Sequence, residues 1–114
     1  MQKVEDKFNS RLAPGWFPYI ECGKGWYPLI SETLDQLEEA DPNYVIHQIK
    51  EKFGELRVYI SGNEAAQDIA DKAGEKSTHI CDVCGQEGSL RNLNGWLATT
   101  CEDHNIQQRW EVNK

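Results

Sequence analysis

The residues of this chain whose types and spacing could support chemistry lie between positions 81 and 104. Two residues separate Cys81 from Cys84, sixteen separate Cys84 from Cys101, and two separate Cys101 from His104. A pair of donors at this close spacing can hold one ion from a tight turn, and a second pair completes a tetrahedron. We therefore predict one bound Zn²⁺, with Cys81, Cys84, Cys101 and His104 as its ligands.

The number of donors indicates that this zinc is structural. A catalytic zinc usually has three protein ligands and an open position for water, whereas four good donors are available here. Cytidine-deaminase-like chemistry requires a His-x-Glu motif and a proline ahead of the first cysteine pair, and neither that glutamate nor the proline precedes Cys81. We expect a closed site, with His79 as an alternative ligand.

Disulfide bonds are the other use that four cysteines allow. The chain begins with polar and charged residues rather than with the apolar leader of a secreted protein. A reducing cytoplasm keeps thiols free and favours a metal site over a bridge, so we expect a cytoplasmic protein. Cys22 lies far from the cluster and is interpreted as an ordinary small side chain. No stretch is apolar enough to cross a membrane.

The residues around the ligands predict a treble-clef-like zinc lobe over residues 79–114. Gly85 can close the first ligand pair with a positive φ, and Asn94-Gly95 predicts the tight turn of a β-hairpin. Acidic residues after the third cysteine favour the first turn of a helix over residues 102–111. The metal would hold this lobe together, because its apolar core is too small to do so alone.

Residues 1–78 are predicted to form an α+β core that makes one compact unit with the zinc lobe. Apolar residues recur with a helical period in three segments and alternate with polar residues in a fourth. The expected elements are helices over residues 1–13, 26–40 and 64–76, and two strands with strict alternation over residues 44–60. The predicted fold is thus a small antiparallel β-hairpin packed by two to three helices, followed by the zinc lobe.

Composition and charge limit the classes of partner. The net charge is −7 and the isoelectric point about 4.9, whereas nucleic-acid binders neutralise phosphates with basic patches. An acidic helix face over residues 26–40 and an aromatic, glycine-rich segment over residues 16–27 instead predict a protein-binding surface. Its candidate residues are Trp16, Tyr19, Trp26, Tyr27, Glu32, Asp35, Glu38 and Glu39. Aromatic packing and an ordinary solvated helix face are the simpler interpretations.

Three other functions stay open on the sequence alone. A zinc lobe that binds nucleic acid would use Arg91, Trp96 and Arg109. An enzyme would use His47 with Glu51 and Arg57 on the predicted hairpin, although a histidine in mid-strand is more often structural. The third function is a role in virion assembly, including self-association.

Four stretches carry a resemblance to known proteins. They are Gly25-Trp26-Tyr27-Pro28-Leu29-Ile30, Ile49-Lys50-Glu51-Lys52-Phe53-Gly54-Glu55-Leu56-Arg57-Val58-Tyr59, Cys81-Asp82-Val83-Cys84-Gly85, and Gly95-Trp96 ahead of Cys101-Glu102-Asp103-His104. Over residues 20–105 the chain resembles a family of small uncharacterised phage and prophage proteins. Many members close the second ligand pair with cysteine, so His104 is a departure that zinc chemistry accepts.

This resemblance implies zinc binding and a phage setting, and it names no activity. Small accessory proteins of phages are often inhibitors of host enzymes or of host defence. We therefore expect a non-enzymatic, zinc-stabilised binding protein in the host cytoplasm. It would engage and inhibit a host or host-defence protein.

Overall fold

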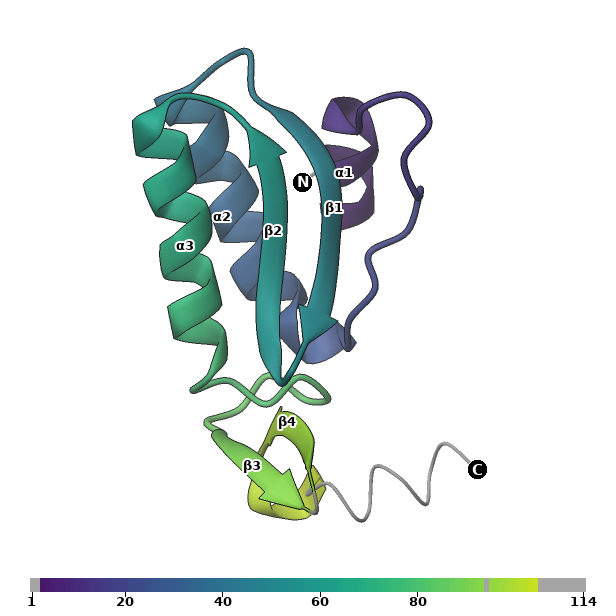
Figure 1. Cartoon of the computed structure of the whole chain (residues 1–114), viewed down its shortest axis with the longest axis vertical. Coiled ribbons are helices and arrows are strands. Elements are labelled where there is room, and N and C mark those ends of the chain that lie inside the picture. Colours follow the sequence, from purple (N-terminus) through teal and green to yellow (C-terminus); the bar gives the residue numbers. More distant parts are fainter. Residues whose placement is uncertain (1–2, 94, 105–114) are drawn as a thin grey trace.

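The computed structural model describes residues 3–93 and 95–104, which form three α-helices and two separate two-stranded antiparallel sheets (Figure 1). The elements are α1 (Val4–Arg11), α2 (Tyr27–Ala40), β1 (Val45–Lys52), β2 (Glu55–Ser61), α3 (Glu64–Ser77), β3 (Ser89–Leu93) and β4 (Trp96–Thr100). Short 3-10 turns precede α2 (Lys24–Trp26) and follow β4 (Glu102–His104). The predicted α+β class is confirmed. The helix predicted over residues 102–111 is described only at its start, where Glu102–His104 form a 3-10 turn. Residues 105–111 lie outside the described residues.

The apolar core lies between the β1–β2 sheet and the helices. α2 buries the stripe that its helical period predicts, and Pro28 is tolerated in its first turn, where no intrahelical donor is needed. α3 begins after Asn63, whose side-chain oxygen accepts a hydrogen bond from the N–H of Ala66 at 2.9 Å. The buried side chains of this core are Val4, Phe8, Trp26, Leu29, Ile30, Leu34, Leu37, Tyr44, Ile46, Ile49, Leu56, Ile60, Ala66, Ala70 and Ala73.

The predicted strict alternation along β1 is wrong at one point. It would place Ile46 and Ile49 on opposite faces of the sheet, yet both side chains are fully buried. The register between β1 and β2 shifts between Ile46 and Gln48, which is a β-bulge. A bulge adds one residue to one strand and so reverses the faces of the residues beyond it. Both isoleucines therefore reach the core.

Helices α1, α2 and α3 lie on one face of the β1–β2 sheet, and no helix of the described residues lies on the other face (Figure 1). Cross-strand partners share a face, so the buried pair Ile46–Ile60 marks the inner face. The pairs Gln48–Tyr59, Lys50–Arg57 and Lys52–Glu55 alternate with the inward pairs. They form what we call the outer sheet face. Within residues 3–93 and 95–104, no helix combines the length and the apolar character needed to span a bilayer.

Candidate metal centre

The four predicted ligands come together in the folded chain. The thiol sulfurs of Cys81, Cys84 and Cys101 and the Nδ1 atom of His104 all lie within 4.8 Å of one another. Sγ of Cys84 is 3.7 Å from Sγ of Cys101, and Nδ1 of His104 is 3.9 Å from Sγ of Cys81 and 3.3 Å from Sγ of Cys101. Tetrahedral zinc with Zn–S bonds of about 2.3 Å places its sulfurs about 3.8 Å apart. These separations therefore fit one zinc ion.

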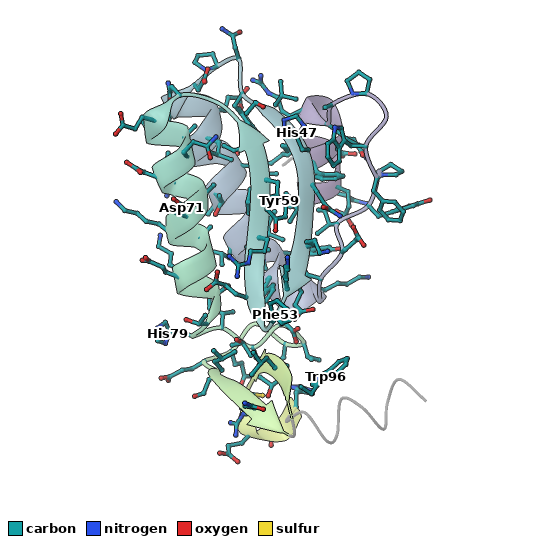
Figure 2. The ribbon with its side chains drawn as sticks, in the orientation of Figure 1. His47, Phe53, Tyr59, Asp71, His79 and Trp96 are labelled. Carbon is teal, nitrogen blue, oxygen red and sulfur yellow. The ribbon has the colours of Figure 1, made fainter. Side chains whose placement is uncertain are left out.

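The other uses of these side chains are not supported by the geometry. The structure describes all four cysteines and none of them forms a disulfide bond; the 3.7 Å between the sulfurs of Cys84 and Cys101 is far beyond a disulfide bond of about 2.05 Å. The predicted alternative ligand His79 is exposed at the lower end of α3 and is not part of the cluster (Figure 2). Cys22 packs against the apolar core, as expected of a small side chain.

Backbone hydrogen bonds shape the first ligand pair into a tight turn. The N–H of Gly85 donates to the carbonyl of Cys81 at 2.9 Å, and the N–H of Cys81 donates to the carbonyl of Gln86 at 2.7 Å. Gly85 has a φ of +83°, which a residue with a Cβ adopts at a cost. The positive φ predicted for this glycine is confirmed.

The β3–β4 hairpin positions the second ligand pair. Gly95 has a φ of +89°, and its N–H donates to the side-chain oxygen of Asn92 at 2.9 Å. This is the predicted tight turn, although Asn94 itself lies outside the described residues. β4 then delivers Cys101, and the N–H of His104 donates back to its carbonyl at 3.1 Å. This 3-10 turn brings the imidazole to the sulfurs.

The electrostatic environment favours a thiolate at Cys81. Burial raises the pKa of this thiol, but hydrogen bonds from the backbone N–H groups of Cys84, Cys101 and Val83 outweigh burial and lower the pKa to about 7. At Cys84 the N–H of Gln86 lowers the pKa, while partial desolvation and the neighbouring thiols raise it, and the pKa lies above its ordinary value. Zinc would be held by both sulfurs as thiolates, the metal-binding form, so that binding would release the proton of Cys84.

The segment ahead of α2 forms a seat for the first ligand turn. The N–H of Gly25 donates to the carbonyl of Asp82 at 2.9 Å, and the indole N–H of Trp26 donates to the carbonyl of Ile80 at 2.7 Å. A Cβ on Gly23 would collide with the carbonyl oxygen of Asp82, and a Cβ on Gly25 would lie 2.7 Å from its carbonyl carbon. Only glycine allows this close approach of two backbones.

This seat changes the interpretation of two predicted partner-binding residues. Trp26 was expected on a binding surface, but its side chain is 0% exposed and belongs to the core. A fully buried ring cannot contact a partner, so we leave Trp26 out of the proposed surface. Tyr27 is half-buried, and burial raises the pKa of its hydroxyl. Gly23 and Gly25, on either side of Lys24, are the sequence feature that could have indicated this close contact between two backbones.

A second contact fixes the zinc lobe to the tip of the β1–β2 hairpin. The hydroxyl of Thr99 donates to the carbonyl of Gly54 at 2.6 Å. Leu90 packs against the same glycine, and a Cβ on Gly54 would lie 3.1 Å from the backbone of Ala98. The lobe therefore rests on two core segments far apart in sequence, at one end of the molecule (Figure 1).

No protein-family model, no curated protein and no solved structure matches this chain. The resemblance to phage proteins therefore stays a prediction.

The acidic face of α2 is partly used inside the molecule. Lys7 of α1 forms an ion pair with Asp35 at 2.9 Å, and Arg11 of α1 forms one with Glu38 at 3.0 Å. These two carboxylates therefore help to hold α1 on α2. Glu32 and Glu39 are exposed and form no ion pair among the described residues.

The three residues predicted to bind nucleic acid from the zinc lobe differ in their surroundings. Arg91 donates to the carbonyl of Thr100 at 3.3 Å and lies 3.6 Å from the carboxylate of Glu102, so its guanidinium is bound within the lobe. Trp96 is exposed at the side of the lobe (Figure 2). Arg109 lies outside the described residues.

The candidate enzymatic residues on the first hairpin do not converge. His47 Nε2 lies 2.6 Å from the hydroxyl of Ser61, with which it shares a hydrogen bond. The carboxylate of Glu51 accepts the N–H of Gly54 at 2.7 Å, and Arg57 pairs with Glu55 at 3.2 Å. Each group thus has its own local partner.

Proposed function

We propose that this protein is a zinc-stabilised binding protein whose metal has a structural and not a catalytic role. Three thiolates and one imidazole fill the four positions that zinc prefers, which leaves no open position for a substrate. The same four residues join the first ligand turn to the β3–β4 hairpin. The zinc ion supports the lobe, and the binding surface lies elsewhere.

The binding surface that we propose is the aromatic loop, which we define as Trp16–Tyr19. Trp16, Phe17 and Tyr19 are 50, 51 and 64% exposed, although each is large enough to occupy a core position. The rings of Phe17 and Tyr19 pack edge to face with their centroids 5.2 Å apart. Exposed, clustered aromatic side chains are the residues that most often dominate protein–protein binding.

The aromatic loop is held in place at both of its ends. The N–H of Ala13 donates to the carbonyl of Ile46 at 2.8 Å. Beyond the loop, the N–H of Glu21 donates to the carbonyl of Ile49, and the N–H of Glu51 donates to the carbonyl of Glu21, both at 2.9 Å. A loop anchored to β1 in this way loses less conformational entropy when it binds. This anchoring, together with the exposure of the rings, carries the proposal.

The partner that we propose is a host or host-defence protein in the bacterial cytoplasm, and the proposed effect of binding is inhibition. The support for this partner is the resemblance of the sequence motifs to phage proteins. The exposed carboxylates of Glu32 and Glu39 would add attraction to a basic partner surface.

The test compares the wild-type protein with two exposed double variants in a pull-down from nuclease-treated bacterial lysate. Phe17→Ser with Tyr19→Ser removes two rings of the aromatic loop, and Glu32→Lys with Glu39→Lys reverses the free charges on α2. We expect a stoichiometric partner that the charge variant retains in part and the aromatic variant loses. Recovery of the same partner by the aromatic variant would refute the proposed surface.

The structural role of the metal has its own test. Purified protein should carry about one equivalent of zinc. Cys84→Ser should lower both the zinc content and the midpoint of thermal unfolding, whereas Cys22→Ser, which lies outside the cluster, should change neither the zinc content nor its retention against a chelator. A zinc-free protein with unchanged stability would contradict the role that we assign to the metal.

A further inference from the structure

The outer sheet face carries three cationic side chains and one carboxylate, that of Glu55, in an otherwise acidic protein. Lys50 and Lys52 project from β1, and Arg57 from β2 lies opposite Lys50. Arg57 pairs with Glu55, while Lys50 and Lys52 form no ion pair among the described residues. Two lysine ammonium groups are therefore available on a face that none of the helices in the described part of the chain covers (Figure 1).

Aromatic side chains follow the same face from end to end. Figure 2 shows Tyr59 near its centre, with His47 towards one end and Phe53 at the other. Tyr59 is 41% exposed and Phe53 is 65% exposed. At the far end Trp16 packs edge to face on His47, with ring centroids 5.3 Å apart. The Nζ atom of Lys52 lies 5.8 Å from the centroid of Phe53, so cation and ring are adjacent.

We propose that the outer sheet face binds single-stranded nucleic acid, with Lys50 and Lys52 on the phosphates and Tyr59 and Phe53 stacked against the bases. Residues two apart on a strand lie about 6.7 Å from each other on one face. This spacing is of the order of the distance between successive phosphates of an extended strand. Cations that track the backbone, interleaved with rings that accept any base, are the usual elements of single-strand binding.

The surroundings of this face favour one strand over a duplex. The outer sheet face continues into an open groove of about 1000 Å³ that α3 borders with Asp71 and Glu75. These carboxylates repel phosphates on the α3 side, and the carboxylate of Glu21, which accepts the side-chain N–H of Gln48 at 2.9 Å, repels them beside that end of β1. Phosphates are therefore confined to the part of the face that carries Lys50 and Lys52. An acidic peptide would satisfy the two lysines, but it offers no series of flat rings to Tyr59 and Phe53. The charge pattern and the rings together select a single strand.

The backbone conformation of Phe53 supports a role for its ring in binding rather than in stabilising the fold. Phe53 has a φ of +54° and is followed by Gly54 with a φ of +81°. Asparagine is favoured at the first of these two positions in a tight hairpin turn, and a large aromatic residue is disfavoured there. The ring is exposed and so contributes little burial in return. Strain of this kind at an exposed position points to a function.

The experiment titrates the full-length, zinc-loaded protein into a fluorescein-labelled oligothymidine of about twelve nucleotides and follows anisotropy. We expect weak binding in the micromolar range at about 50 mM salt. With two to three phosphates neutralised, affinity should fall about tenfold when salt rises from about 50 to about 200 mM. Lys50→Glu with Lys52→Glu should weaken binding more than tenfold. Lys72→Glu with Lys76→Glu on α3 carries the same change of charge and should weaken it much less.

Phe53→Asn separates binding from folding. The substitution places Asn-Gly at the hairpin tip, so the variant should unfold at a higher temperature than the wild type. It should nevertheless bind the oligonucleotide several-fold more weakly, because the terminal ring is gone. Phe17→Ser with Tyr19→Ser should bind normally, which distinguishes this site from the proposed protein-binding surface.

Four outcomes would overturn the proposal. They are flat titrations at low salt, equal loss of affinity in the α3 charge variant, equal affinity for duplex DNA of the same length, and equal affinity for poly-glutamate. The last two would show a general anion site rather than a single-strand site.

Discussion

Gly25→Ala is the substitution that tests the seat of the zinc lobe most directly. Gly25 has no positive φ, so alanine can adopt its backbone conformation, and the effect arises from space alone. The added Cβ would lie 2.6 Å from the backbone nitrogen of Gly85 and 2.7 Å from the carbonyl carbon of Asp82. Backbone atoms cannot move aside as a flexible side chain can. The first ligand turn must therefore shift away from α2.

The expected loss of stability follows from three contributions. Displacement breaks the hydrogen bond from Gly25 to Asp82, which contributes about 1 kcal/mol. Overpacking at a tight contact costs about 1–3 kcal/mol. Replacing glycine by alanine also restricts the unfolded chain, which offsets about 0.4–1 kcal/mol of this loss of stability. We expect a net loss of about 2 kcal/mol in the free energy of unfolding, and weaker zinc retention because the turn carries Cys81 and Cys84.

The assay is urea unfolding together with competition for zinc by a chromogenic chelator. Gly15→Ala is the matched control, since Gly15 has a φ of +83° and nothing within 4 Å of the added Cβ. Gly15→Ala should lower the free energy of unfolding through backbone strain alone, by about 1–2 kcal/mol before the same gain of about 0.4–1 kcal/mol from the restricted unfolded chain is subtracted. Zinc retention should not change. If Gly25→Ala retains zinc as well as Gly15→Ala does, the lobe does not depend on this seat and the reasoning is wrong.

Three further predictions concern the same elements. Trp26→Phe removes the indole donor to Ile80 and should lower the free energy of unfolding by about 1–3 kcal/mol, measured by urea unfolding; no loss would show that the hydrogen bond is replaced by water. Phe53→Asn should raise that free energy by about 1 kcal/mol, because asparagine tolerates the left-handed conformation, and a lower value in urea unfolding would contradict the assignment of strain. Metal-free protein should gain stability as the pH rises from about 7 towards 9, because the pKa of Cys81 is about 7 in the folded chain against an ordinary value of 9.0. This contribution is complete above the higher value and is lost as the pH falls through the lower one, so Cys81→Ser should flatten the profile.

The ligand set could be predicted from sequence because its geometry is local. Each pair of donors is separated by two residues, so a single turn brings both donors to one ion, and Gly85 and Gly95 mark the turns that do so. The three helices were predictable for a similar reason. Their apolar residues repeat with the helical period, and local signals mark two of the starts, since Asn63 caps α3 and Pro28 lies in the first turn of α2.

Which aromatic and acidic side chains are exposed could not be predicted, because exposure depends on contacts between distant segments. The sequence pattern grouped Trp26 with the exposed aromatic residues, since nothing local distinguishes a ring that faces the core from one that faces solvent. It also treated Asp35 and Glu38 as free charges, although α1 supplies a cation to each of them across more than twenty residues of chain.

The sequence by itself determined which four donors cluster and the class of fold, because these follow from spacing and periodicity within single elements. Only the tertiary structure decided where the zinc lobe sits and which faces remain exposed. The bulge that buries Ile46 and Ile49 together, and the glycines that admit the backbone of Asp82, depend on which segments meet in space. Contacts between distant segments are set by the packing of the whole chain, so no short sequence pattern predicts them.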